Sequence, residues 1–242
     1  MKFLILGDTH AFWHETNVTI AKAIRQHPDI THIVQVGDFG YGDWTGGKPF
    51  KPSKGFFSDE ELAIYNAAEK MWIDGNHEGF DQLEADGGAW QPGWTHMPRG
   101  SVLEVDGIRM MFFGGASSID KHMRTEGKSW WHQEDITMRQ IQETLDTVEG
   151  PIDALFTHEH AGCIPYSDDR YKHDHLPSKG NRQLLDVLVD RYQPDYCFFG
   201  HHHHADQGTV GTMEWYCCPI IETYWYTIWT GYSVQTHWRE NG

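Results

Sequence analysis

The strongest constraint on the fold is a set of five short apolar runs, each followed by a cluster rich in Gly, Asp, Asn or His. Each run is short enough for a strand that is buried on both faces. The runs span residues 3–6, 32–36, 71–73, 154–156 and 196–199. Segments with helical periodicity lie between them, at about 15–26, 59–69, 134–147 and 181–192. This alternation indicates an α/β fold with parallel strand pairs.

Two further segments have a different pattern and indicate hairpin-like strands. Residues 101–113 alternate apolar and polar side chains on either side of Asp106-Gly107, and an Asp-Gly pair in this setting predicts a β-hairpin. The aromatic segment 209–234 also departs from the short-run pattern. A mixed sheet, or two packed sheets, is therefore favoured over a purely parallel sheet.

Length and composition predict a single domain over residues 1–242, because no stretch resembles an interdomain linker. Three long polar loops, at 40–58, 117–132 and 162–180, are expected near the functional site, since such loops are usually functional. No apolar run approaches the ~20 residues of a membrane span. The adjacent Cys217 and Cys218 do not suit a disulfide framework. These features indicate a cytoplasmic protein without membrane contact.

Charge and histidine content narrow the class of ligand. The formal net charge is −16, which disfavours long nucleic acids as partners because the chain repels phosphate backbones. Carboxylates that bind divalent cations would account for part of this charge. The chain also contains 17 His, an excess that draws attention to metal binding.

Potential metal ligands follow each of the five apolar runs directly. The clusters are Gly7-Asp8-Thr9-His10, Gly37-Asp38, Gly75-Asn76-His77-Glu78, Thr157-His158 and Gly200-His201-His202-His203. In open α/β sheets, ligands bind at the carboxyl ends of the strands, where these clusters would meet. Imidazole, carboxylate and amide oxygen suit Mn, Fe, Zn, Co or Ni. One such cluster alone is readily explained as a turn or a helix cap, but five in this arrangement predict a metal centre.

In two of the clusters, the sequence does not decide which of the histidines are the ligands. Residues two apart in an extended segment point the same way, so alternate histidines act as a set. We prefer the first histidine after each strand, and Gly200 supports this choice in the fifth cluster. The alternatives are His158 or His160 after the fourth strand, and His201 with His203 or His202 with His204 after the fifth.

The five clusters resemble the motifs of the calcineurin-like metallophosphoesterases. The family pattern is Asp-x-His, Gly-Asp, Gly-Asn-His-Asp/Glu, a lone His and Gly-His-x-His, and all five blocks occur in this order between residues 7 and 203. The resemblance implies an α/β fold, a four-layer αββα sandwich with two mixed β-sheets and helices outside. It also implies two divalent metal ions at the carboxyl edge of the sheets, with Mn as the first choice and Fe, Zn, Co or Ni as alternatives.

The resemblance also implies a role for each matched residue. His77 matches the catalytic histidine that contacts the phosphate and protonates the leaving oxygen or stabilises the transition state. In such enzymes a hydroxide held by metals ~3.5–4 Å apart attacks the phosphorus in line. The implied ligands are Asp8, His10 and His203 for the first metal, Asn76, His158 and His201 for the second, and Asp38 for both.

The expected activity is hydrolysis of small or nucleotide-type phosphodiesters. Many family members carry an Arg a few residues after the bridging Asp, whereas this chain continues from Asp38 as Phe-Gly-Tyr-Gly-Asp. The missing Arg argues against a protein phosphatase. The alternatives are a phosphomonoesterase of the same fold, a nuclease and, more distantly, a non-catalytic metal-binding scaffold. The sequence indicates no oligomeric state.

Several loop residues are candidates for contacts with the substrate. Arg124 follows the Gly114-Gly115 turn and is a candidate substrate-binding residue together with His77. The segment 173–175, His-Asp-His, is a candidate for a cap over the site. The aromatic segment 215–238 either packs on the second sheet or forms an interface.

Lysines after the second cluster bear on the nuclease alternative. We interpret Lys48, Lys51 and Lys54 as solvated loop residues. A nuclease would instead need a basic channel beside the metals. It would gather Lys48, Lys51, Lys54, Arg124 and Arg170 on one surface.

Overall fold

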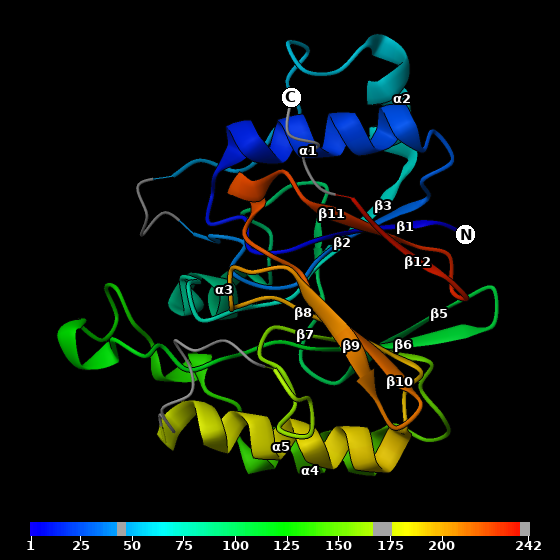
Figure 1. The fold of residues 1–242 in the computed structure, drawn as a ribbon. Coiled ribbons are helices and arrows are strands. Elements are labelled where there is room, and N and C mark those ends of the chain that lie inside the picture. Colours follow the sequence, from blue (N-terminus) through cyan, green and yellow to red (C-terminus); the bar gives the residue numbers. More distant parts are fainter. Residues whose placement is uncertain (43–46, 167–175, 238–242) are drawn as a thin grey trace.

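The five apolar runs become strands of two sheets that pack face to face. The computed structural model describes residues 1–42, 47–166 and 176–237. Each sheet has six strands, and helices cover the outer faces of both (Figure 1). This is the expected four-layer sandwich of two mixed sheets.

The first sheet combines parallel strands from the N-terminal half with the C-terminal strands. Strands β1 to β4 are parallel, whereas β11 pairs antiparallel with β1 and β12 pairs antiparallel with β11. The order is β12-β11-β1-β2-β3-β4. Their bounds are Phe3–Leu6 (β1), His32–Gln35 (β2), Glu69–Trp72 (β3), Thr95–His96 (β4), Tyr226–Trp229 (β11) and Val234–His237 (β12).

The second sheet has a parallel centre and antiparallel edges. Strands β6, β7, β8 and β10 run parallel, and β5 and β9 form the antiparallel edges. The predicted hairpin is the pair β5–β6. The strands, in sheet order, are Ser101–Val105 (β5), Ile108–Phe113 (β6), Ala154–Thr157 (β7), Tyr196–Phe199 (β8), Met213–Cys217 (β10) and Asp206–Val210 (β9).

Helices close the two outer faces. Figure 1 shows α1 and α2 on the outer side of the first sheet and α4 and α5 on the outer side of the second. The α-helices are Trp13–Gln26 (α1), Asp59–Ala67 (α2), Phe80–Asp86 (α3), Met138–Thr147 (α4) and Leu176–Tyr192 (α5). Short 3₁₀ turns lie at Lys121–Met123 (η2), His132–Glu134 (η3) and Ile221–Thr223 (η5).

Strand β1 illustrates how the layers form. Successive side chains of a strand point to opposite faces, so Phe3 and Ile5 enter the core between the sheets while Leu4 and Leu6 face α1. Leu4 and Leu6 share their cluster with Ile20 of α1. Because both faces of β1 are covered, every residue of the strand is buried.

Local signals explain where some elements begin and end. Helix α2 ends at Ala67 rather than near residue 69, because the backbone is extended at Ala68 before β3 begins. Helix α4 begins at Met138 rather than at residue 134, since Thr137 caps it in a capping box. Part of the segment 162–180, expected as a loop, belongs to α5, which begins at Leu176.

The aromatic C-terminal segment packs into the sandwich. Trp215 lies in the core beneath α4 and α5, and Trp229 lies between the sheets. Trp238 is outside the described residues. Across residues 1–42, 47–166 and 176–237, no helix combines the length and the apolarity that a membrane span needs.

Candidate metal centre

The candidate ligands lie where strands of both sheets end. Asp8, Asp38 and Asn76 follow β1, β2 and β3 of the first sheet. His158 and His201 follow β7 and β8 of the second sheet. Because the strands within each group are parallel, their carboxyl ends share one edge of the sandwich, and the side chains converge there.

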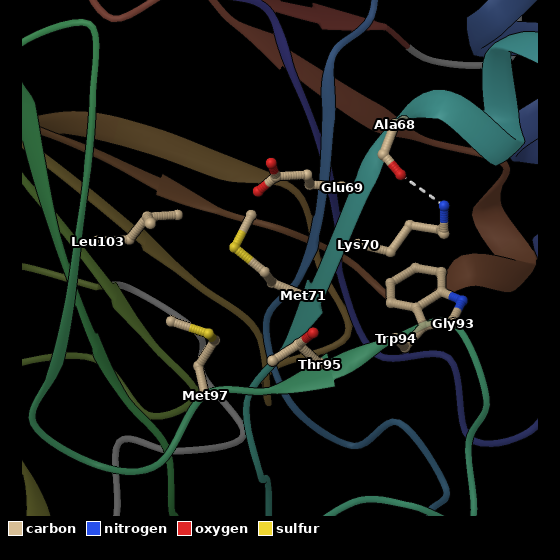
Figure 2. Close-up of a pocket in the computed structure, with 9 residues that line it drawn as sticks. All are labelled: Ala68, Glu69, Lys70, Met71, Gly93, Trp94, Thr95, Met97 and Leu103. Carbon is tan, nitrogen blue, oxygen red and sulfur yellow. Dashed lines mark hydrogen bonds between the residues drawn. The ribbon is translucent and has the colours of Figure 1, made fainter.

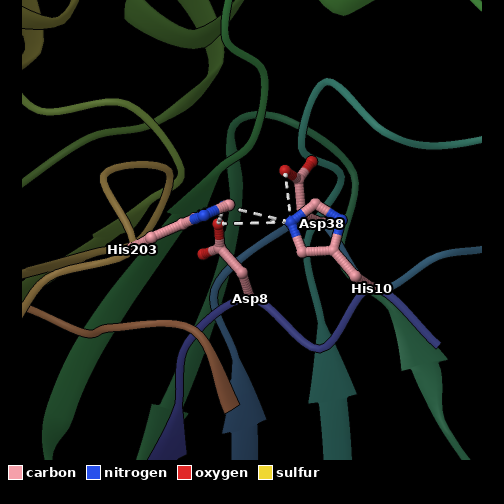
Figure 3. A group of neighbouring side chains, drawn as sticks. All are labelled: Asp8, His10, Asp38 and His203. Carbon is pink, nitrogen blue, oxygen red and sulfur yellow. Dashed lines mark hydrogen bonds and ion pairs between the residues drawn. The ribbon is translucent and has the colours of Figure 1, made fainter. Parts of the chain in front are cut away.

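Four side chains form the first ligand group (Figure 3). One ligand atom each from Asp8, His10, Asp38 and His203 lies within 4.8 Å of all the others. Nε2 of His203 is 3.1 Å from Oδ2 of Asp8 and 3.1 Å from Nε2 of His10. Nε2 of His10 is 3.4 Å from Oδ2 of Asp38. Two carboxylates and two imidazoles therefore point at one place.

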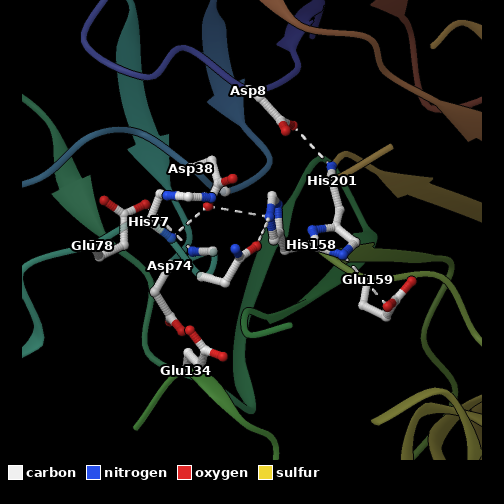
Figure 4. Close-up of polar contacts among 12 residues, drawn as sticks. Asp8, Asp38, Asp74, His77, Glu78, Glu134, His158, Glu159 and His201 are labelled. Atoms are coloured by element: carbon white, nitrogen blue, oxygen red, sulfur yellow. Dashed lines mark hydrogen bonds and ion pairs between the residues drawn. The ribbon is translucent and has the colours of Figure 1, made fainter. Parts of the chain in front are cut away.

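A second group lies on the other side of Asp38 (Figure 4). Asp38, His158 and His201 again offer ligand atoms within 4.8 Å of one another. Nε2 of His158 is 3.3 Å from Oδ1 of Asp38 and 3.3 Å from Oδ1 of Asn76. Asp38 thus directs one carboxylate oxygen to each group, the arrangement expected of a residue shared by two cations.

The chemistry of both groups suits divalent metals. Imidazole nitrogen together with carboxylate and amide oxygen is a donor set that accepts Mn, Fe, Co, Ni or Zn. His10 and His203 present nitrogens 3.1 Å apart beside a buried carboxylate, and a cation would accept the lone pairs of both. The residues present therefore fit two metal ions.

Strained backbone marks the same residues. His10, Asp38, His201 and His203 all have positive φ, between 43° and 68°. This left-handed region is uncommon for residues other than glycine, and each such residue costs roughly 1–3 kcal/mol. Four of the seven candidate ligands therefore hold a conformation that the surrounding fold must impose, a feature that clusters at functional sites.

Two glycines allow the ligand loops to approach closely. A Cβ at Gly75 would lie 2.2 Å from Oδ1 of Asp38, and a Cβ at Gly200 would lie 2.3 Å from Oδ1 of Asp8. Any side chain at either position would displace a candidate ligand. The Gly that precedes Asn76 and the Gly that precedes His201 are thus required by packing at the site.

The buried carboxylates and histidines of the site strongly shift one another's pKa values. Burial alone would raise the pKa of Asp38, but neighbouring histidines, His158 first, hold that pKa well below its ordinary value. Burial lowers the pKa of His158, yet Asp38 and Asp8 outweigh it and raise the pKa to about 10. For His201 burial dominates and lowers the pKa to about 3. The carboxylates thus carry negative charge into the site, where divalent cations would compensate it.

Glu78 holds two of the ligand loops together, a role that the sequence did not reveal. Its carboxylate accepts hydrogen bonds from the backbone N–H groups of Phe39, Gly40 and Tyr41 at 2.6–3.0 Å and of Gly75 at 3.3 Å. It therefore connects the loop after β2 to the loop after β3. Burial and the nearby Asp38 raise the pKa of Glu78 to about 8.

The structure distinguishes between the alternative histidines in the fourth and fifth clusters. His160 and His202 lie in a different buried group with Glu159, and Nε2 of His202 is 3.1 Å from Oε1 of Glu159. His158 and His201 face Asp38, and Nε2 of His201 also lies 3.7 Å from Oε2 of Glu159. His204 is exposed. The first histidine after each strand is therefore the one that points into the candidate site.

Arg124 and His77 lie together at the mouth of the site. Nη1 of Arg124 donates to Nδ1 of His77 at 3.2 Å, and Nε of Arg124 pairs with Asp120 at 2.7 Å. Burial lowers the pKa of His77; Asp38 opposes this effect, whereas His10 and Arg124 act in the same direction as burial. The cavity here measures about 210 Å³ and is lined by Asp38, Asn76, His77, Ser118, Ile119, Asp120, Arg124, His201 and His203.

The other loop candidates lie elsewhere. Lys48, Lys51 and Lys54 are exposed and do not line this cavity. Arg170 and the segment 173–175 fall outside the described residues. A separate cavity of about 440 Å³ lies at the β3–β4 edge of the first sheet, and its lining includes Lys70, Met71 and Leu103 (Figure 2). None of the candidate ligands lines that second cavity.

Solved structures share this fold over almost the whole chain. TT1561 of Thermus thermophilus is 9% identical, with a TM-score of 0.57 and coverage of 98% of this chain and 97% of that one. GAP50, the anchor in the inner membrane complex of Plasmodium, is 13% identical, with a TM-score of 0.55 and coverage of 98% and 84%. A candidate 5′-nucleotidase from Staphylococcus aureus, in complex with α-ketoglutarate, is 13% identical with a TM-score of 0.58. This chain aligns over 94% of its own length and spans half of that protein.

Comparison with protein families agrees with the motifs and with the fold. No curated protein matches the sequence. The family model for calcineurin-like phosphoesterases matches residues 1–205, a range that contains all five ligand clusters. Members of this family are phosphoester hydrolases. With its fold, its five clusters and this match, the chain belongs to the calcineurin-like phosphoesterase family.

Proposed function

We propose that this chain is a phosphodiesterase that uses two divalent metals to hydrolyse small or nucleotide-type phosphodiesters. The observation that carries the proposal is the position of Asp38, whose two carboxylate oxygens face different ligand groups. Mn is the first metal to test. Fe, Zn, Co and Ni are the alternatives, because this set of donors accepts all of these metals. The proposed ligands are Asp8, His10 and His203 on one metal, Asn76, His158 and His201 on the other, and Asp38 on both.

The chain's own residues then orient the ester. When bound, the metals supply an activated water and neutralise charge on the phosphoryl oxygens. His77 is held in place because its backbone N–H donates to Oδ1 of Asp38 at 2.8 Å. Its ring faces the cavity beside Arg124, where it can reach the leaving oxygen. Nε of Arg124 pairs with Asp120, and Nη1 donates to His77 and to the carbonyl of Ser129, so Nη2 is the group that can contact a phosphate oxygen.

The charge of the cavity favours a diester over a monoester. Arg124 is the single Lys or Arg among the described residues that line it, and Asp120 partly compensates its charge. A diester carries one negative charge at neutral pH, whereas a monoester carries nearly two. A long nucleic acid fits less well, because Lys48, Lys51 and Lys54 do not line the cavity and the net charge is −16.

Hydrolysis of model esters tests the proposal. Metal-stripped protein is reloaded with Mn²⁺ and assayed with bis-p-nitrophenyl phosphate and p-nitrophenyl phosphate. We expect Mn²⁺-dependent turnover of the diester, and a fall of about 10²- to 10³-fold in Asn76→Ala and His77→Ala, typical for loss of a group that stabilises the transition state. His204→Ala, an exposed histidine outside both ligand groups, serves as the control and keeps wild-type activity.

Other outcomes point to the alternatives. Turnover of the monoester alone would replace the proposal with a phosphomonoesterase. Two bound metals without turnover of either ester would refute a general phosphodiesterase and favour a metal-binding scaffold.

Substitution of Arg124 tests the proposed contact with substrate. We expect Arg124→Met to lower kcat/KM for the diester by about 10²-fold, because the guanidinium stabilises charge on the phosphoryl group. Arg124→Lys is expected to recover only part of the loss, since an ammonium lacks the planar fork of donors. Lys121→Met is the matched control, because Lys121 lies in the same segment but pairs with Asp135 at 3.1 Å. Equal kinetics in Arg124→Met and Lys121→Met would contradict the contact.

A further inference from the structure

The side-chain amide of Asn76 is held by two residues from a distant part of the chain. Nδ2 of Asn76 donates to Oγ of Ser118 at 3.1 Å, and Oγ of Ser118 donates to Oε2 of Glu134 at 2.7 Å. The backbone N–H of Ser118 also donates to Oε1 of Glu134, at 2.6 Å. All three residues are buried, with Glu134 fully inaccessible, so little water competes for these bonds.

The direction of these bonds decides which way the amide points. Burial raises the pKa of Glu134 to about 7, although its hydrogen bonds from Ser118 oppose that rise. Above that pH the carboxylate is ionised and can only accept, so Ser118 donates the hydrogen of its hydroxyl to Glu134. The oxygen of Ser118 is then left as an acceptor and faces the NH₂ group of Asn76. The amide oxygen must therefore face the other way, and Oδ1 of Asn76 lies 3.3 Å from Nε2 of His158 in the second ligand group.

The backbone that carries this chain of bonds is itself braced. Arg99 donates to the carbonyl of Glu134 at 3.1 Å and to Oδ2 of Asp74 at 2.7 Å. Asp74 precedes Asn76 by two residues, and its carbonyl accepts the N–H of Gly115 at 2.8 Å. The segment with Ser118 and Glu134 and the loop with Asn76 are thus joined at several points, so their relative position is well defined.

We propose that Ser118 and Glu134 are positioning residues for the second metal. They hold Asn76 so that its carbonyl oxygen, rather than its NH₂ group, faces the metal. This inference rests on the proposed function, because it presumes that Asn76 is a ligand. Partners that orient metal ligands typically change metal affinity by about 10- to 100-fold.

Binding of Mn²⁺ to the metal-stripped chain, followed by calorimetric titration and by electron paramagnetic resonance, tests the proposal without any assay of turnover. We expect the wild type to bind two Mn²⁺ ions. Ser118→Ala and Glu134→Gln are expected to bind one ion as tightly as the wild type and the other about 10- to 100-fold more weakly. In Glu134→Gln an NH₂ group replaces one acceptor oxygen, so the Ser118 hydroxyl and N–H can no longer both donate to it.

Ser117 offers a matched control next to Ser118. It is also buried, but its hydroxyl donates to Asp135 and accepts from Nδ2 of Asn181 at 3.0 Å, away from Asn76. Ser117→Ala therefore removes the same atoms from a neighbouring site and is expected to leave both Mn²⁺ affinities unchanged. Thermal melts of the metal-free variants establish that each is folded, and Glu134→Gln keeps the volume of the side chain if Ser118→Ala is unstable.

The outcomes separate this inference from the proposed function. Wild-type affinity for both ions in Ser118→Ala and Glu134→Gln would overturn the positioning role alone. A wild type that binds no second Mn²⁺ ion would overturn both the two-metal centre of the proposed function and the positioning role. Weakened binding of the second ion in the two variants, with no turnover in the wild type, would refute the hydrolase and support the positioning role.

Discussion

Replacement of Asp38 by Asn is expected to abolish turnover and to weaken both metal sites at once. Asp38 belongs to both ligand groups, with Oδ2 3.4 Å from Nε2 of His10 and Oδ1 3.3 Å from Nε2 of His158. Asn has nearly the same shape, but one ligand oxygen becomes an NH₂ group and the negative charge is lost. We expect activity to fall by about 10³-fold or more, since a single stabilising group is already worth about 10²–10³.

Metal content and diester hydrolysis measured on the same samples check this expectation. Asp186→Asn is a suitable control, because Asp186 also accepts a backbone N–H, from Cys163 at 2.7 Å, but lies outside both ligand groups. The loss in Asp38→Asn should exceed that in Asn76→Ala, which touches one group only. An Asp38→Asn protein that retains two Mn²⁺ ions and measurable turnover would show that Asp38 is not shared.

The second large effect concerns stability and centres on Arg99. The side chains of Arg99 and Asp74 are only 7% and 4% exposed, and they pair at 2.7 Å. Arg99 also donates to the carbonyl oxygens of Gln133 and Asp135 at 2.9 Å. Removing one partner of a buried ion pair leaves an uncompensated charge, which costs about 3–5 kcal/mol. We therefore expect Arg99→Ala to lower the free energy of unfolding by that amount.

Urea or thermal unfolding measures this loss, with an exposed ion pair as the comparison. Arg25 pairs with Glu61 at 2.8 Å, but its side chain is 60% exposed, so Arg25→Ala is expected to cost about 0–1 kcal/mol. A loss in Arg99→Ala no larger than that in Arg25→Ala would contradict the importance of the buried pair.

The same pair predicts a response to acid. Burial would raise the pKa of Asp74, but Arg99 and His96 outweigh it and hold the pKa well below its ordinary value of 3.8. A carboxylate with a lowered pKa contributes stability that is present above its ordinary pKa and is lost as the pH falls further. The contribution of this pair should therefore be complete at neutral pH and be lost progressively as the pH falls through 3.8 and further.

The helical and strand elements were predictable to different degrees. The five apolar runs were identified because a short buried strand is apolar throughout, whichever sheet it joins. Helix α3 and strand β4, with seven and two residues, were missed because such short segments show no clear periodicity. Helix α2 begins at Asp59, as predicted, after its cap Ser58. The capping box at Thr137 was present in the sequence and would have refined the start of α4.

The motifs in the sequence were enough to identify the candidate metal ligands and the strand ends at which they lie. This was possible because motif spacing and the carboxyl ends of parallel strands are local properties. The motif resemblance implied that Asp38 is shared by both metals, and the folded structure shows its carboxylate between the two ligand groups. The bond between Ser118 and Asn76, by contrast, was found only in the folded structure. Asn76 and Ser118 are 42 residues apart in the chain. A contact over that separation depends on how the two sheets pack rather than on any local sequence pattern. The same holds for Arg99 and Asp74, which lie 25 residues apart in the chain and meet only in the folded protein.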